Sequence, residues 1–258
     1  MTYPVCALSR SASKVAAMAA PSTESAVRKA LYDVRTRIAK TVESHKIARE
    51  PRLVAISKTK PIEAIREAYE AGHRHFGENY VQEISEKAPE LPDDICWHFV
   101  GHLQSNKIKL LLDSVPNLSM LETVDSVKLA NKLNNAVDSL KRSPLPVMVQ
   151  VNTSGEESKS GVSPDDAVEL ARHVHNGCQN LRLAGLMTIG MPDYTSRPEN
   201  FQCLKECRKR ICKELGLQED ELELSMGMSG DFENAIAMGS TNVRVGSTIF
   251  GARDYSKK

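Results

Sequence analysis

The sequence predicts a single (β/α)8 TIM barrel, an α/β fold in which eight parallel strands alternate with helices. Eight short runs rich in apolar residues alternate with amphipathic helical stretches, and such regular alternation indicates parallel βαβ units. The chain has 258 residues, close to the ~250 that a barrel of this kind requires. No Pro-, Gly- or Ser-rich linker divides it, so we expect one domain. A doubly wound open sheet is the alternative.

The predicted elements begin with one long helix. From Ser22 to Val42 apolar residues recur at helical spacing over a charged background, and Ser22 or Thr23 is the expected N-cap. The predicted strands follow as Leu53–Ser57, Arg74–Gly77, Trp97–Gly101, Leu118–Val124, Pro146–Asn152, Leu181–Ile189, Leu222–Gly227 and Asn242–Gly246. Further helices are expected to begin near Pro61, Asn79, Ser105, Ser126, Pro164, Arg197, Asp231 and Ser247.

The charge balance argues against a nucleic-acid partner. Lys and Arg total 34 and Asp and Glu total 33, so the net charge is +1. Affinity through counterion release needs a basic surface, which this composition does not indicate. No run reaches the ~18 to 20 apolar residues of a membrane-spanning helix, so no membrane association is expected.

The cysteines and the N-terminal segment indicate the cellular compartment in which the protein is expected. Six scattered cysteines and no secretory signal sequence predict free thiols and a cytoplasmic protein. Cys203, Cys207 and Cys212 have helical spacing without a CxxC pair, so we expect helix residues and no metal site. Residues 1–21 are rich in Ala and Ser and weakly resemble an organellar targeting segment. A disordered tail is the preferred interpretation, which leaves 22–258 for the barrel.

Lys58 is the first candidate functional residue. Functional groups of a barrel lie at the C-terminal ends of its strands, and the first predicted strand ends in SKTKP. The period of two places Val54, Ile56 and Lys58 on one face, so Lys58 lies at the mouth if the other two fill the barrel. Partial desolvation there lowers the pKa of an amine, which can then form an imine with a carbonyl. A solvated loop lysine is the alternative, and Lys60 competes for the role.

The last two strands predict an anion site. Arg244 is flanked by two valines, so it points into the barrel if the valines pack against helices, and a buried guanidinium requires an anion or strong acceptor. Gly246 and Ser247 follow, offering close backbone approach, a hydroxyl and the free amides of a short helix. After the seventh strand, Ser229 or Asp231 is the expected cap of the next helix.

These groups together suggest a ligand that carries both an aldehyde and a phosphate. Pyridoxal 5'-phosphate has this combination. A sugar phosphate that an aldolase processes through a lysine imine has it too, without a cofactor. Beside a pyridine nitrogen, Arg244 would keep the ring unprotonated and a weak electron sink, but it could instead serve the phosphate.

Seven motifs occur in order at the predicted strand ends. They are LVAISKTKP (Leu53–Pro61), HFGENYVQE (His75–Glu83), WHFVGHLQSNK (Trp97–Lys107), VNTSGEESKSGV (Val151–Val162), GLMTIG (Gly185–Gly190), LSMGMSGDFENAI (Leu224–Ile236) and GSTNVRVGSTIFGARDY (Gly239–Tyr255). With these motifs the chain resembles the pyridoxal phosphate homeostasis protein family, also called the proline synthase co-transcribed family. The resemblance covers Ala26 to Lys258.

The resemblance implies a fold-type III barrel, like the N-terminal domain of alanine racemase, with pyridoxal phosphate attached covalently to Lys58 as an internal aldimine. It implies cofactor contacts at Ser229, Gly246 and Ser247, through the phosphate, and at Arg244. Further expected pocket residues at strand ends are Asn79, His98 and Met226. Tight turns, rather than contacts, are expected at Gly77, Gly101 and Gly227.

The resemblance also implies a role in intracellular vitamin B6 homeostasis, with indirect effects on amino acid and keto acid pools, and no catalytic residue. Racemases of this fold complete their sites with a C-terminal β domain and a partner subunit, which supply a second acid or base. We expect neither here, and therefore a monomer. Apo-enzymes are expected recipients, with Lys60 or Lys159 as transient acceptors. A pyridoxal-phosphate-dependent amino acid racemase is the first alternative, and a cofactor-free aldolase the second.

Overall fold

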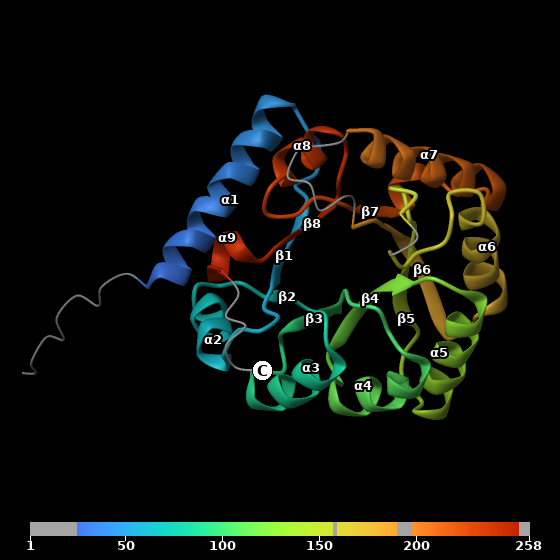
Figure 1. The fold of residues 1–258 in the computed structure, drawn as a ribbon, viewed down its shortest axis with the longest axis horizontal. Helices are drawn as coiled ribbons and strands as arrows, with labels where there is room; N and C mark the ends of the chain where they lie inside the picture. Colours follow the sequence, from blue (N-terminus) through green and yellow to red (C-terminus); the bar gives the residue numbers. More distant parts are fainter. Residues whose placement is uncertain (1–24, 157–158, 190–197, 253–258) are drawn as a thin grey trace, which may run out of the picture.

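Eight parallel strands close into a barrel in the computed structural model, which describes residues 25–156, 159–189 and 198–252. Each strand pairs with its neighbours in sequence, and β1 pairs with β8 to close the ring. Helices surround the strands (Figure 1). The predicted (β/α)8 barrel is confirmed and the open sheet is wrong, while the expected tail at 1–21 lies outside the described residues.

The strands are short, as the runs in the sequence predicted. They are β1 (Arg52–Ile56), β2 (His75–Glu78), β3 (Cys96–Phe99), β4 (Leu118–Val124), β5 (Leu145–Gln150), β6 (Leu181–Met187), β7 (Glu223–Ser225) and β8 (Asn242–Val245). Every boundary lies within two residues of its prediction.

Nine α-helices occur in the part of the chain that the structure describes. They are α1 (Ala26–Ser44), α2 (Ile62–Glu70), α3 (Val81–Lys87), α4 (Ile108–Ser114), α5 (Val127–Ser139), α6 (Ala167–Gly177), α7 (Pro198–Leu215), α8 (Phe232–Ala237) and α9 (Ser247–Phe250). Helix α5 begins next to Ser126, as predicted, and Ser126 is its N-cap, since its side chain accepts a hydrogen bond from the amide of Leu129 at 3.2 Å. The cap of α1 is Ser25, so the prediction of Ser22 or Thr23 is wrong.

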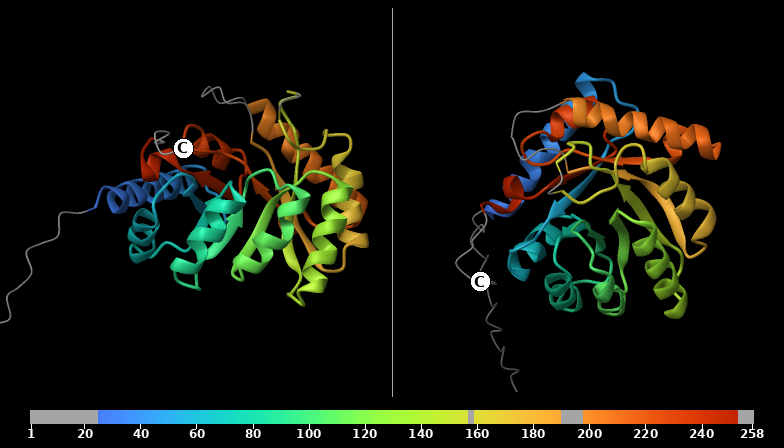
Figure 2. Two further views of the ribbon diagram at one scale, coloured as in Figure 1. Left: turned by 60° about the horizontal axis from the view of Figure 1, so that its bottom comes forward. Right: turned by 45° about the vertical axis from the view of Figure 1, so that its right-hand side comes forward.

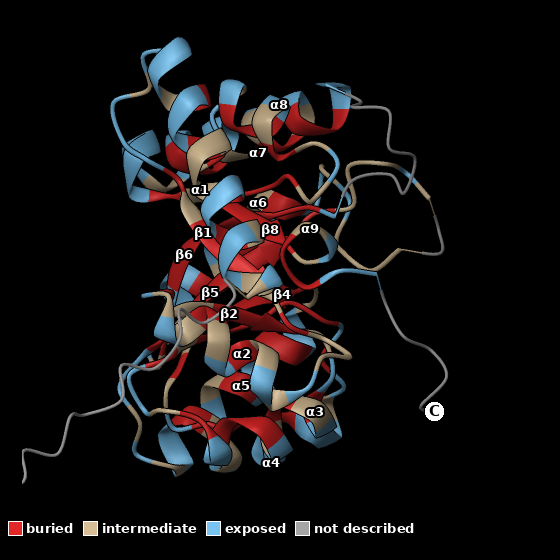
Figure 3. Cartoon of the chain, turned by 90° about the vertical axis from the view of Figure 1, so that its left-hand side faces the viewer, coloured by how far each residue is buried: buried red, intermediate tan, exposed pale blue. Residues whose placement is uncertain are grey.

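Side chains alternate between two buried layers. Leu53, Ala55, Val243 and Val245 point outward into a large core beneath the helices. Four inward-facing residues, Met120, Met148, Ala184 and Met187, form a separate cluster inside the barrel. Figure 3 shows the buried strands and the exposed outer surfaces of the helices. The fold thus has an apolar shell and an interior that leaves room for polar residues.

Helix α1 covers one side of the barrel. It packs against α2, α8 and α9, so the first described helix lies beside the last two helices (Figure 2). Cys207 and Cys212 are buried in α7, as expected of helix residues. Among the described residues no cluster of His, Cys, Asp and Glu is arranged to hold a metal ion. Nor is any described helix long and apolar enough to span a membrane.

Two of the three glycines expected in tight turns have another role. Gly77 lies within β2, where a Cβ would come within 2.5 Å of the Ile56 side chain. A Cβ on Gly101 would lie 1.9 Å from the carbonyl oxygen of Asn79. Gly227 alone has a left-handed backbone, with φ +94°. Gly77 and Gly101 therefore permit close approach between neighbouring segments.

We predict that Gly101→Ala destabilises the protein by about 2 to 3 kcal/mol, because its methyl group meets backbone that cannot rotate away. Gly177→Ala is the matched control, since a Cβ at that position meets no atom closer than 3.4 Å. Urea unfolding of the two variants measures the difference. Equal urea midpoints for the two variants would show that the backbone at Asn79 shifts at little cost in stability.

Candidate functional site

Lys58 lies in a tight turn directly after β1. The amide of Ser57 donates to the carbonyl of Gly77 at 3.0 Å, and the amide of Lys60 donates to the carbonyl of Ser57 at 3.0 Å. Within this turn Thr59 has φ +62°, a left-handed conformation that β-branched residues rarely adopt. Lys58 therefore lies at the C-terminal end of the first strand, where the sequence placed it, and it is partly buried.

Three charged side chains from β2 and α3 hold this turn in place. The carboxylate of Glu83 accepts from the amide of Thr59 at 2.8 Å. The ammonium of Lys87 donates to the Ser57 carbonyl at 3.0 Å, to Glu78 at 2.8 Å and to Glu83 at 2.7 Å. Burial raises the pKa of the Glu78 carboxyl, and the charge of Lys87 opposes that shift. The strained backbone beside Lys58 is thus held by an ion cluster on α3 and β2.

Sequence reasoning missed this cluster, although a signal was present. Glu83 and Lys87 are four residues apart, a spacing that brings side chains together on one face of a helix. Glu78 ends the neighbouring strand, so its carboxylate meets the same helix. The competing lysine is directed elsewhere: Lys60 donates to the carbonyl of Ala252 at 2.5 Å. The assignment of ligand attachment to Lys58 rather than Lys60 stays a prediction.

The loops after β7 and β8 meet at the mouth. The hydroxyl of Ser229 accepts from the amides of Gly246 at 3.2 Å and Thr248 at 3.5 Å. A Cβ on Gly246 would lie 3.2 Å from the carbonyl oxygen of Ile56, so a glycine lets this loop approach the end of β1. Exposed Ser247 follows as the first residue of α9. The Ser229 hydroxyl accepts these two amide hydrogen bonds and has its own proton to donate, so it is a suitable donor for a phosphate beside the Lys58 turn.

The N-terminus of α8 differs from the prediction that Ser229 or Asp231 caps the helix. Asp231 occupies the N-cap position, but its carboxylate accepts from the amide of Met228 at 2.6 Å and makes no capping bond to the helix. Ser229 does not cap α8 either, because its hydroxyl bridges to the β8 loop. Ser229 therefore links the loop after β7 to the loop after β8, and Asp231 restrains the loop after β7 through its bond to Met228.

Arg244 points into the barrel, as the alternation of β8 predicted. Its guanidinium donates to the hydroxyl of Ser225 at 2.5 Å and to the carbonyl of Thr188 at 2.7 Å. Ser225 in turn donates to the carboxylate of Glu122 at 2.5 Å, and Asn242 donates to the same carboxylate. The anion that the buried guanidinium requires is therefore part of the protein.

Glu122 was also missed, although a charged residue in the middle of the apolar run LSMLETV was a visible signal. It is fully buried. Burial alone would raise the pKa of its carboxyl, but the hydrogen bond from His98 and the charges of His98 and Arg244 lower it. Burial also lowers the pKa of the Arg244 guanidinium, and Glu122 opposes that shift. The carboxylate is thus ionised and balances Arg244.

Three expected pocket residues lie in different places. His98 is the next-to-last residue of β3, as expected near a strand end, and it points into the barrel, where Nδ1 is 2.7 Å from Glu122 and Nε2 is 3.1 Å from Nδ1 of His75. The side chain of Met226 packs in the outer hydrophobic core, facing the helices. Asn79 follows β2, and its Oδ1 is buried without a hydrogen-bond partner among the described residues. Only Asn79 of the three offers an unsatisfied polar atom near the mouth.

We predict that Glu122→Gln destabilises the protein by about 3 to 5 kcal/mol, because it leaves the Arg244 guanidinium buried without its counter-charge. Glu214→Gln is the control, since Glu214 pairs with Arg172 on the surface and its loss costs about 0.5 kcal/mol. Chemical denaturation of both variants gives the comparison. A Glu122→Gln variant as stable as the control would show that Ser225 and Thr188 suffice for Arg244.

The chain is similar to known proteins over most of its length. Residues 34–254 match the family model of the alanine racemase N-terminal domain. The human pyridoxal phosphate homeostasis protein is 54% identical over 81% of this chain and 79% of its own length. The fission yeast protein of that name is 49% identical over 80% of this chain and 85% of its own.

Solved structures show the same barrel. PipY of Synechococcus elongatus, determined with pyridoxal phosphate bound, superposes with a TM-score of 0.69 and 34% identity, over 87% of this chain and 100% of that one. An alanine racemase of Clostridium difficile superposes with a TM-score of 0.68 at 16% identity, which shows a shared fold. This chain covers 57% of that racemase. On this evidence the chain belongs to the alanine racemase N-terminal domain family and, within it, to the pyridoxal phosphate homeostasis proteins.

Proposed function

We propose that this protein binds pyridoxal 5'-phosphate at the barrel mouth and takes part in controlling its intracellular supply. One observation carries the proposal: the turn with Lys58 and the loops with Ser229 and Gly246 adjoin, because β1 pairs with β8. An amine and a set of phosphate donors at one mouth match the aldehyde and the phosphate of this cofactor. The relative PipY, whose structure contains pyridoxal phosphate, supports the assignment.

Different residues of the mouth would bind different parts of the cofactor. The cofactor, when bound, supplies an aldehyde for reversible covalent attachment to an amine. Lys58 would provide that amine, held by the ion cluster behind its turn. Ser229, Gly246 and Ser247 would hold the phosphate through hydroxyl and amide donors. These positions agree with what the family resemblance implies for Lys58 and the phosphate.

Arg244 and Asn79 complete the proposed pocket. Because Glu122 already balances the charge of Arg244, the guanidinium does not need the phosphate as a counter-ion. We therefore assign Arg244 to the pyridine nitrogen, where a cation keeps the ring a weak electron sink. The buried Oδ1 of Asn79 is an acceptor available to a hydroxyl of the ligand. A cofactor ring that is a weak electron sink suits storage and release of the cofactor better than catalysis.

The test of binding is reduction of the cofactor complex. After incubation with pyridoxal phosphate, borohydride reduction and mass spectrometry should find a pyridoxyl adduct on Lys58 in the natural protein. The same adduct is expected in Lys60→Ala and none in Lys58→Ala. Equal trapping in Lys58→Ala would move the attachment to Lys60. A protein with neither a visible absorption band nor an adduct would contradict the proposal and favour the cofactor-free aldolase.

We further propose that catalysis is not the main role of this chain. His98, which could have served as a second acid or base, is enclosed in the barrel and bonded to Glu122. Delivery to apo-enzymes, with Lys60 or Lys159 as transient acceptors, stays a prediction, as do the monomeric state and the cytoplasmic location. Lys159 pairs with Glu156 in the structure.

The racemase alternative is favoured by the alanine racemase N-terminal domain match. It predicts interconversion of D- and L-amino acids by the cofactor-loaded protein at about 1 s⁻¹ or faster, within the range of ordinary enzymes. Homeostasis without substantial catalysis predicts far slower turnover across a panel of amino acids. Chiral chromatography of each reaction decides between the two.

A further inference from the structure

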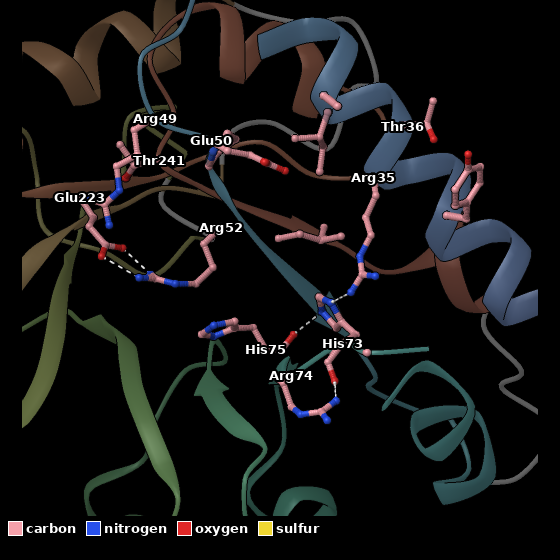
Figure 4. A pocket seen from close by; sticks show the side chains of 16 residues that line it. Arg35, Thr36, Arg49, Glu50, Arg52, His73, Arg74, His75, Glu223 and Thr241 are labelled. Carbon is pink, nitrogen blue, oxygen red and sulfur yellow. Dashed lines mark hydrogen bonds and ion pairs between the residues drawn. The ribbon is translucent and has the colours of Figure 1, made fainter. Parts of the chain in front are cut away.

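A cavity of about 750 Å³ lies at the N-terminal ends of the strands, at the opposite end of the barrel from Lys58. It is bounded by α1, the segment before β1 and its first residues, the segment that leads into β2, the first residue of β7 and the residue before β8 (Figure 4). Its volume is typical of small-molecule sites. No residue of the pocket proposed above lines it.

Positive charge dominates this cavity. Four arginines and two glutamates line it. Arg52 is paired with Glu223 by two hydrogen bonds, at 2.5 and 2.9 Å. Arg74 is paired with Asp94, which lies outside the lining, at 2.8 Å. Two guanidinium groups, those of Arg35 and Arg49, therefore remain without a carboxylate partner.

Neutral partners hold Arg35 in place. It donates to the carbonyl of Ala71 at 3.2 Å and lies 3.2 Å from Nδ1 of His73. Nε2 of His73 contacts the carbonyl of His75 at 2.8 Å, so Nε2 carries the proton and Nδ1 accepts from Arg35. Burial lowers the pKa of His73 to about 3, and burial also lowers that of His75 to about 4. Both imidazoles are therefore uncharged at neutral pH.

The charge of Arg35 is thus poorly compensated. Burial lowers the pKa of its guanidinium, and exposed Glu50 is the carboxylate that opposes this shift. Arg49 makes no hydrogen bond or ion pair with the residues that the structure describes. Figure 4 shows both side chains at the cavity, Arg35 reaching from α1 toward His73. A partly buried guanidinium with neutral partners is stabilised when an anion binds beside it.

We propose that this cavity binds a small polyanion, a molecule bearing phosphate or carboxylate groups, with Arg35 and Arg49 as its ligands. The planar forks of the two guanidiniums match the oxygens of either group. Tyr32, exposed on the rim, offers an aromatic face to the rest of the ligand. The site is separate from cofactor binding at the mouth and does not depend on it.

Calorimetric titration of the full chain tests this site, with inorganic pyrophosphate and citrate as separate probes at constant ionic strength. At least one probe should bind, and Arg35→Gln and Arg49→Gln should each weaken that binding about tenfold. Arg37→Gln is the matched control on the same helix, because Arg37 pairs with Glu233 outside the cavity. It should bind like the natural protein.

A second control separates the two ends of the barrel. The titration is repeated on protein whose mouth is blocked by the borohydride-reduced pyridoxyl group, with excess cofactor removed, and probe binding at the cavity should be unchanged. Binding that survives both arginine substitutions, or that is lost when the mouth is blocked, would overturn the proposal. So would no binding of either probe at about 10 mM, a concentration corresponding to negligible affinity. Arg49 lies in an exposed segment, so Arg49→Gln stays informative if Arg35→Gln fails to fold.

Discussion

The barrel depends on a buried carboxylate that balances a buried guanidinium. Glu122 reaches Arg244 through the hydroxyl of Ser225, and both charges are almost fully excluded from solvent. Removing either partner leaves the other uncompensated in a medium of low polarity. Because the same carboxylate also accepts from His98, one residue of β4 sets the positions of side chains on β3, β7 and β8.

This network runs along the barrel interior. Asn242 donates to Glu122 and accepts from Arg52 at 3.4 Å, while His98 contacts His75. Arg52 and His75 line the cavity at the N-terminal ends of the strands. The interior of a barrel of this kind is usually filled by layers of branched apolar side chains. In this protein polar side chains occupy part of the interior and connect its two ends. The apolar stability of the fold comes instead from the outer core between strands and helices.

The fold was largely predictable and the interior was not. Short runs alternating with helical stretches specify βαβ units, and their number fixes the barrel, so strand boundaries such as Leu118–Val124 agree with the structure. Lys58, Ser229, Gly246 and Arg244 were predicted from strand ends and alternation. Glu122, Glu83 and Lys87 were not, because the sequence shows the pairing of Glu83 with Lys87 and the charge inside an apolar run, but not the residues of other strands that these side chains meet. Met226 and His98 lie at strand ends as predicted, but position at a strand end does not determine the face on which a side chain lies: Met226 packs in the outer core, and His98 points into the barrel toward Glu122.

The most direct test of the account is a crystal structure of the protein grown with pyridoxal 5'-phosphate. The account predicts continuous density from the Lys58 amine to the ligand, with the phosphate between Ser229 and Gly246 and Arg244 at the ring nitrogen. Density attached to another lysine, or a phosphate bound only at Arg35 and Arg49, would contradict it.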